Sequence, residues 1–126
     1  MKFTDIAVVV LGAGLGGGLR YALGGWLAER WGSSFPWHTM AVNLSGAFLL
    51  GILMALSLDR GIVSAGWRLF LGVGLLGGYT TFSTLAYESM ALLERGLVLQ
   101  GFGNMLASGL AGLVAVLAGL WVGRVI

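Results

Sequence analysis

The sequence predicts an all-α membrane protein with four transmembrane helices, and three observations support this prediction. Hydrophobic residues make up 58% of the 126-residue chain and charged residues only 10%, whereas soluble domains carry about 25% charged residues. Most of the 23 glycines lie inside apolar runs, and the chain has a single proline, a pattern typical of transmembrane helices. Several of these runs reach the length of about 20 residues that a helix needs to cross a bilayer. The absence of cysteine excludes thiol chemistry, and a scattered net charge of +2 does not indicate nucleic-acid binding.

The four runs cover about residues 3–27, 39–58, 67–93 and 97–122. Short segments between them hold six of the twelve charged residues, and all five tryptophans lie near the ends of runs, as residues of the membrane interface do. The first run is too long for a signal peptide and lacks a strongly basic start. We therefore expect residues 1–126 to form one multi-pass transmembrane domain in the plasma (inner) membrane.

The charges flanking the four runs do not select one membrane orientation. An even number of spans places both termini on the same side. The basic residues on that side are Lys2, Arg60, Arg68 and Arg124, and those on the other side are Arg30 and Arg95. Asp5 and Asp59 share the richer side, so the positive-inside rule gives only a weak bias. A dual-topology protein requires such a weak bias.

Small residues form stripes at a spacing of four in three of the runs. The stripes are Gly12 and Gly16; Ala47, Gly51 and Ala55; and Ala111, Ala115, Gly119 and Gly123. Such stripes predict close helix packing rather than a ligand site.

The middle of the third run is poorly suited to a continuous helix. Two glycines and four hydroxyl residues gather there: Gly77, Gly78, Thr80, Thr81, Ser83 and Thr84. Glycine costs about 1 kcal/mol in a helix interior, and threonine is also a weak helix former. One interpretation is a helix broken at mid-membrane, which lines a hydrated path and exposes backbone groups to an ion. The other is a glycine-kinked helix whose threonines bond back to their own backbone.

Other polar residues lie inside the remaining runs. Thr39 and Asn43 are one turn apart in the second run, as are Asn104 and Ser108 in the fourth. The two amide donors of Asn43 suit a small, hard anion.

Two ionisable residues also lie deep in the runs, where such groups indicate function by default. Arg20 either extends toward an interface or supplies positive charge to an aqueous vestibule. Glu88 is either a capped structural carboxylate or takes part in ion access. The only histidine, His38, is expected in a loop beside Trp37, without a second histidine or a nearby pair of carboxylates, where its role is structural. No set of catalytic residues is evident, so the chain is not expected to be an enzyme.

Three segments together resemble the Fluc (CrcB) family of fluoride-specific ion channels. They are Gly77–Thr84 in the third run, Gly18–Arg20 in the first and Ala41–Leu44 in the second. The resemblance covers essentially the whole chain. It implies a channel that passively exports fluoride from the cytoplasm, formed by an antiparallel homodimer whose third helix is broken at mid-membrane.

The resemblance also implies roles for individual residues. The backbone carbonyls of Gly77 and Thr80 would hold a structural Na⁺ that is not transported. Fluoride would pass Asn43, Phe82, Ser108, Asn104 and Thr39, and Arg20 would be the vestibule charge. The contributions of Glu88, Leu85, Thr81 and Ser83 stay open.

The sequence departs from the family pattern at two places. Leu85 stands where the family generally has a second phenylalanine, and the polar positions of the fourth run are Asn104, Ser108 and Gly112. The alternative is a small dual-topology, proton-coupled multidrug exporter. Such a protein would carry a carboxylate in the middle of its first span, where this chain has Arg20.

Overall fold

The computed structural model describes residues 1–126 and consists of four helical stretches without any strand. The first is α1 (Phe3–Trp31), and the second is α2 (Trp37–Met54) with the π-helical segment η1 (Ala55–Asp59). The third contains α3 (Ala65–Arg68), the π-helical segment η2 (Leu69–Leu76), α4 (Gly77–Tyr79) and α5 (Phe82–Glu94), and the fourth is α6 (Val98–Val125). Each stretch is long and apolar enough to cross a membrane. The four predicted spans are confirmed, with the largest boundary difference at the end of α1, which reaches Trp31 instead of Leu27.

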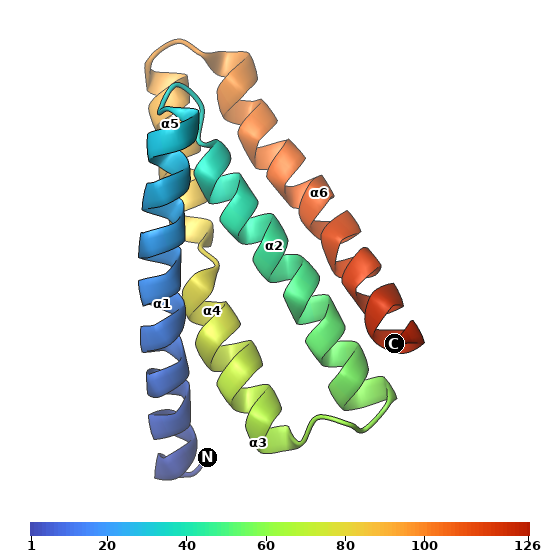
Figure 1. Cartoon of the computed structure of the whole chain (residues 1–126). Coiled ribbons are helices and arrows are strands. Elements are labelled where there is room, and N and C mark those ends of the chain that lie inside the picture. Colours follow the sequence, from blue (N-terminus) through green and yellow to red (C-terminus); the bar gives the residue numbers. More distant parts are fainter.

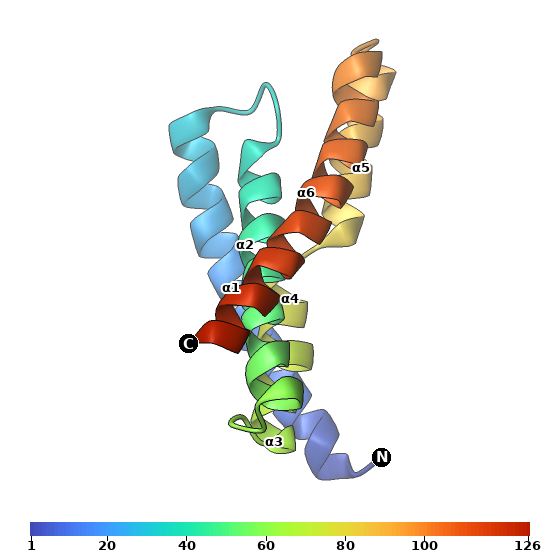
Figure 2. The same ribbon diagram turned by 90° about the vertical axis from the view of Figure 1, so that its right-hand side faces the viewer.

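Successive stretches run in opposite directions, so both termini lie toward one end of the bundle (Figure 1). The loops that join α1 to α2 and α5 to α6 lie at the other end. At that end the α1–α2 pair diverges from the α5–α6 pair (Figure 2). α1 packs mainly against η2 and α4, whereas α2 and α5 both pack against α6. The third stretch therefore changes its helix partner where α4 gives way to α5.

Glycines permit the closest helix approaches. A Cβ added to Gly12 would lie 2.6 Å from the Phe70 carbonyl oxygen, and one added to Gly16 would collide with the backbone of η2. Gly51 of α2 and Gly119 of α6 face each other in the same way. The packing interpretation of the small-residue stripes is confirmed at these glycines.

The helix ends carry the groups expected of a membrane interface. Asp5 accepts a hydrogen bond from the Lys2 backbone N–H at 3.2 Å in the first turn of α1. α1 ends at Trp31 and is followed by Gly32, whose φ of 78° is a conformation that glycine adopts without strain. Near this end the Arg30 guanidinium lies 4.5 Å from the centre of the Trp26 ring.

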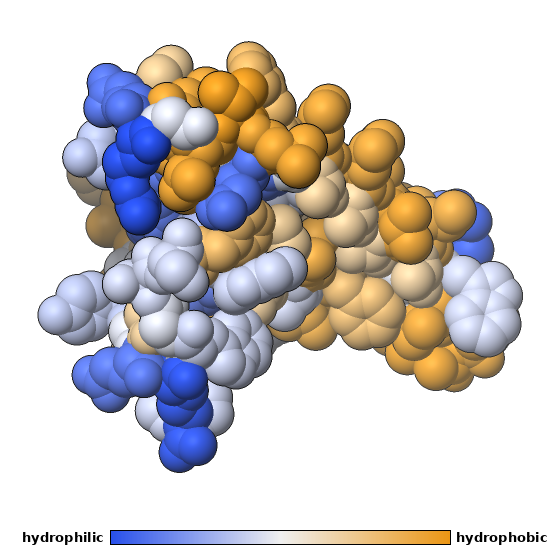
Figure 3. Space-filling view, turned by 90° about the horizontal axis from the view of Figure 1, so that it is seen from above, coloured by the Kyte–Doolittle hydropathy of each residue, from blue (hydrophilic) through white to orange (hydrophobic).

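Most large apolar side chains face outward. Only 24 of the 126 residues are buried, and one small cluster of Val42, Leu53, Leu76 and Tyr79 forms the apolar core. Viewed from the loop end, hydrophilic residues gather over the loops, and an apolar surface extends along α6 (Figure 3). This distribution is the one expected when lipid, rather than water, surrounds the helices.

Candidate functional site

Two residues with extended backbone separate α4 from α5. Thr80 has φ −83° and ψ 157°, and Thr81 has φ −149° and ψ 116°. The Thr80 hydroxyl donates to the Leu76 carbonyl at 2.9 Å, while the Thr81 hydroxyl accepts from the Thr84 N–H at 3.2 Å and caps α5. Threonine hydroxyls thus bond the ends of both helices that flank the two residues.

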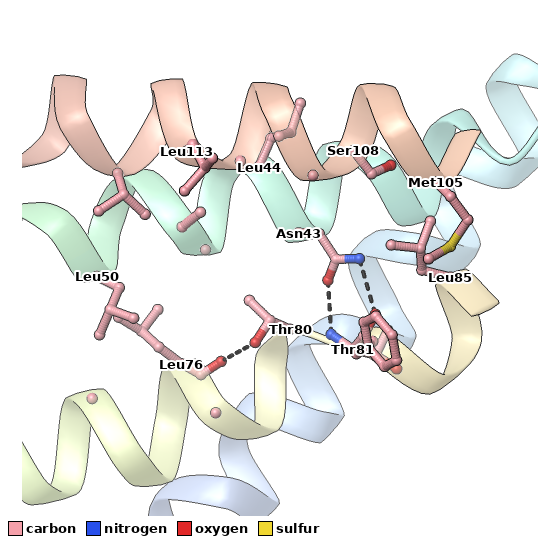
Figure 4. A pocket seen from close by; sticks show the side chains of 18 residues that line it. Asn43, Leu44, Leu50, Leu76, Thr80, Thr81, Leu85, Met105, Ser108 and Leu113 are labelled. Atoms are coloured by element: carbon pink, nitrogen blue, oxygen red, sulfur yellow. Dashed lines mark hydrogen bonds between the residues drawn. The ribbon is translucent and has the colours of Figure 1, made fainter. Parts of the chain in front are cut away.

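Both the nitrogen and the oxygen of the Asn43 side-chain amide, on α2, make hydrogen bonds to the backbone of Thr81. Asn43 Nδ2 donates to the Thr81 carbonyl at 3.0 Å, and Asn43 Oδ1 accepts from the Thr81 N–H at 2.7 Å (Figure 4). We call this pair of bonds the Asn43–Thr81 clasp. An asparagine amide has two N–H donors, so the clasp leaves one of them for a ligand, rather than the two that the sequence offers.

The clasp also releases backbone carbonyls. Because the Thr81 N–H bonds to a side chain, it is not available to the Gly77 carbonyl, and no side-chain, turn or cap hydrogen bond reaches that oxygen or the Thr80 carbonyl oxygen. Free carbonyl oxygens are ligands suited to hard cations. The Gly77 and Thr80 oxygens, without a carboxylate, form a set that fits a monovalent cation such as Na⁺.

A groove of about 500 Å³ lies beside the two extended residues, between α2, the third stretch and α6 (Figure 4). Its lining includes seven of the candidate site residues: Asn43, Gly77, Thr80, Thr81, Phe82, Leu85 and Ser108. Phe82 is 73% exposed although it is a large aromatic residue, whereas Leu85 is 7% exposed. Ser83 is exposed and does not line the groove.

A second cavity of about 240 Å³ lies between α1, the start of α2 and the start of α5. Its polar lining residues are Arg20, Tyr21, His38, Thr39, Thr81 and Thr84. The Arg20 Nε donates to the Gly78 carbonyl at 3.1 Å, so this side chain points into the bundle instead of toward an interface. Since Thr81 lines both the cavity and the groove, the Asn43–Thr81 clasp lies between them.

Glu88 of α5 is held by two consecutive residues of α2. The Thr39 hydroxyl donates to Glu88 Oε1 at 2.9 Å, and His38 Nε2 lies 3.5 Å from the same oxygen. The prediction that His38 lies in a loop is wrong, because the residue belongs to the first turn of α2, and it contacts one carboxylate, that of Glu88. Glu88 is 50 residues away in the chain, a distance over which spacing alone gives no signal.

Asn104 of α6 does not line the groove. It is 1% exposed, its Nδ2 donates to Ser89 Oγ at 2.9 Å, and its Oδ1 accepts from the Ser108 hydroxyl at 3.5 Å. Of this pair only Ser108 reaches the groove, with Asn104 behind it. The sequence analysis missed Ser89, a hydroxyl residue inside an apolar span.

Comparison with known proteins identifies the family. Residues 7–120 match the family described as CrcB-like protein, Camphor Resistance (CrcB). The chain belongs to the CrcB family. This membership confirms the resemblance found in the sequence, and the matched region includes every candidate residue from Arg20 to Ser108.

Several curated relatives cover most of the chain and are named fluoride-specific ion channel FluC. One from Chloroflexus aurantiacus is 44% identical over 121 residues, which are 96% of each chain. One from Thermus thermophilus is 50% identical over 102 residues, covering 78% of this chain and 80% of the relative. The Rhizobium meliloti protein is 42% identical over 117 residues, with 93% and 94% coverage. Together with the four spans, CrcB membership makes the chain a multi-pass membrane protein, which in bacteria lies in the plasma membrane.

Proposed function

We propose that this CrcB-family protein is a fluoride-specific ion channel and not an enzyme. Its relatives are named fluoride-specific ion channels, and these names are the reason for proposing fluoride as the conducted ion. The observation that carries the proposal is the Asn43–Thr81 clasp beside an open groove. The clasp fixes the orientation of an amide donor next to half-buried threonine hydroxyls and the exposed Phe82 ring, where a small anion needs replacements for its water ligands.

The groove offers fluoride several weak partners. Asn43 retains one N–H donor, and the exposed Phe82 ring has a positive edge. The Ser108 hydroxyl borders the groove and has a single proton, which its long 3.5 Å bond to Asn104 Oδ1 would give up to fluoride. Conduction requires binding that is favourable enough to admit the ion and weak enough to release it. We assign these residues to the fluoride pore together with Thr39, and we assign Asn104 to orienting Ser108.

Arg20 is the vestibule charge in this proposal. It is the only fully ionised cation among the residues lining the second cavity, and a positive group in a low-dielectric cleft raises the local anion concentration. Its bond to the Gly78 carbonyl ties that charge to the start of the path past the clasp.

We infer that two copies assemble as an antiparallel homodimer, with the third helix acting as a broken helix at mid-membrane. Three observations support this assembly: the weak charge bias of the loops, the 500 Å³ groove on one side of the bundle, and the exposure of Phe82 at that groove. A two-fold axis in the membrane plane passes through mid-depth, so it would bring the two α4–α5 junctions together.

A structural Na⁺ is proposed at that junction. No side-chain, turn or cap hydrogen bond reaches the carbonyl oxygens of Gly77 and Thr80, and two chains would supply four such oxygens. The ion would neutralise carbonyl dipoles that the extended backbone leaves unpaired, without itself being transported.

Fluoride export through such a channel needs no energy source beyond the membrane potential. Hydrogen fluoride enters cells as a neutral molecule and dissociates at cytoplasmic pH, which traps the anion inside. A negative-inside potential drives a monovalent anion outward by about 2.3 kcal/mol per 100 mV. Passive export would therefore lower the cytoplasmic fluoride concentration and its toxicity.

Anion efflux from liposomes containing the purified protein tests the proposal. We expect fast, electrogenic fluoride efflux with negligible chloride efflux, and no requirement for a proton gradient. Liposomes without protein give the background. Fluoride movement that occurs only in exchange for protons would refute the channel and favour the proton-coupled exporter.

A further inference from the structure

The carboxylate of Glu88 is held at one oxygen by the first turn of α2. Thr39 donates to Oε1 at 2.9 Å, and His38 Nε2 lies 3.5 Å from that same oxygen. The side chains of His38 and Glu88 are 25% and 21% exposed, so most of this contact is buried. The other oxygen, Oε2, and the second ring nitrogen of His38 are buried without a hydrogen-bonding partner in the chain.

His38 and Thr39 line the 240 Å³ cavity, whereas Glu88 does not. The two residues therefore stand between the carboxylate and the cavity. On the cavity wall, Arg20 supplies a permanent positive charge, and Tyr21 is the only other titratable group besides His38. The facing helix α6 has a single ionisable residue, Arg124, in its last turn.

The carboxylate stays behind this wall only because its neighbours hold it there. The terminal torsion of a glutamate side chain is broad, so the side chain itself does not fix the direction of its oxygens. Because Oε2 has no partner, rotation toward the cavity would break only the contacts at Oε1. Removing the imidazole would open space in the direction of the cavity.

We propose that His38 is a positioning residue that keeps the Glu88 carboxylate out of the anion cavity. This proposal rests on the proposed fluoride channel. With His38 present, an anion in the cavity meets Arg20 without an opposing carboxylate. Without His38, the carboxylate reaches the cavity and offsets the attraction of Arg20.

Fluoride efflux from liposomes tests this role through a cycle of four proteins: wild type, His38→Ala, Glu88→Gln and the double variant. We expect His38→Ala to lower efflux about tenfold in the wild-type background, because like charges a few ångströms apart repel strongly in partly solvated protein. In the Glu88→Gln background the same change should have less than about a twofold effect, since no carboxylate remains to repel the ion. His38→Gln, which keeps an N–H donor near Oε1, should retain most of the wild-type efflux. Gln100→Ala, an exposed change on α6, serves as the control for substitution itself.

A structural role for His38 predicts a different pattern. If His38→Ala lowers efflux equally in both backgrounds, the residue only supports the fold and the proposal is overturned. Unchanged efflux in His38→Ala overturns it as well. If wild-type protein conducts no fluoride, the proposed channel function fails, and the positioning role that rests on it fails with it.

Discussion

Replacement of Asn43 by alanine removes both bonds of the Asn43–Thr81 clasp. The two lost hydrogen bonds measure 2.7 Å and 3.0 Å, and the Thr81 N–H and carbonyl have no other hydrogen-bonding partner. An unpaired buried backbone group costs about 1–3 kcal/mol. Thr81 is only partly buried, so we expect Asn43→Ala to lower the free energy of unfolding by about 2–3 kcal/mol. Asn43→Asp keeps the acceptor for the Thr81 N–H but replaces the amide donor with a carboxylate oxygen, which the Thr81 carbonyl repels. We expect this variant to abolish fluoride efflux.

Unfolding by detergent titration in mixed micelles measures the first effect, and liposome efflux measures the second. Ser45→Ala is the matched control, because Ser45 lies on the same helix and bonds to the Tyr79 hydroxyl and the Val42 carbonyl. It should cost about 1 kcal/mol or less. An Asn43→Ala protein as stable as the Ser45→Ala protein would show that the clasp does not hold the α4–α5 junction. An Asn43→Asp protein that conducts like wild type would show that the free amide donor is not used.

Further predictions concern packing, the pore and the cation. Gly16→Ala should lower the free energy of unfolding by about 1–3 kcal/mol, because the added Cβ meets the backbone of η2. Gly14 has nothing within 4 Å of an added Cβ, so Gly14→Ala should leave the free energy of unfolding unchanged or raise it by up to about 1 kcal/mol. Phe82→Ile should reduce fluoride efflux severely through loss of the ring edge; full efflux in Phe82→Met would show that the ring only fills space. Leu85→Phe should retain efflux, since Leu85 borders a groove with room for a ring, and a large loss would contradict this. Replacing Na⁺ with a bulky organic cation should lower fluoride efflux without any Na⁺ transport, and equal efflux would argue against the site.

Composition was sufficient to predict the four spans, because a helix that crosses lipid must be long, apolar and internally hydrogen-bonded. It could not predict the π-helical segments η1 and η2, which depend on how each helix fits its neighbours. Hydrophobic periodicity also gives little help in a membrane. Since lipid is as apolar as the protein interior, the sequence does not indicate which face of each helix points inward.

The same limit explains what the sequence predicted of the site. Residue types marked Asn43 and Arg20 as unusual, since polar groups inside a span need partners. Their partners lie 38 and 58 residues away, so only the folded chain identifies them as Thr81 and Gly78. His38 was misjudged for this reason: its contact with a carboxylate depends on how α2 is rotated against α5.

The change of partner along the third stretch explains why polar residues gather where they do. Its first half is rich in glycine and packs tightly against α1. A Cβ added to Gly74 or Gly78 would meet the α1 backbone at 3.0 Å or less. Its second half lacks glycine and packs on α6. Between the halves the chain belongs to neither helix pair, so its backbone groups lose helical partners in a region without bulk water. Arg20 and Asn43, from the two helices beside the junction, satisfy the Gly78 carbonyl and both polar groups of Thr81. The groups that these bonds leave over include one amide donor and the Gly77 and Thr80 carbonyl oxygens, and we propose that these groups bind ions.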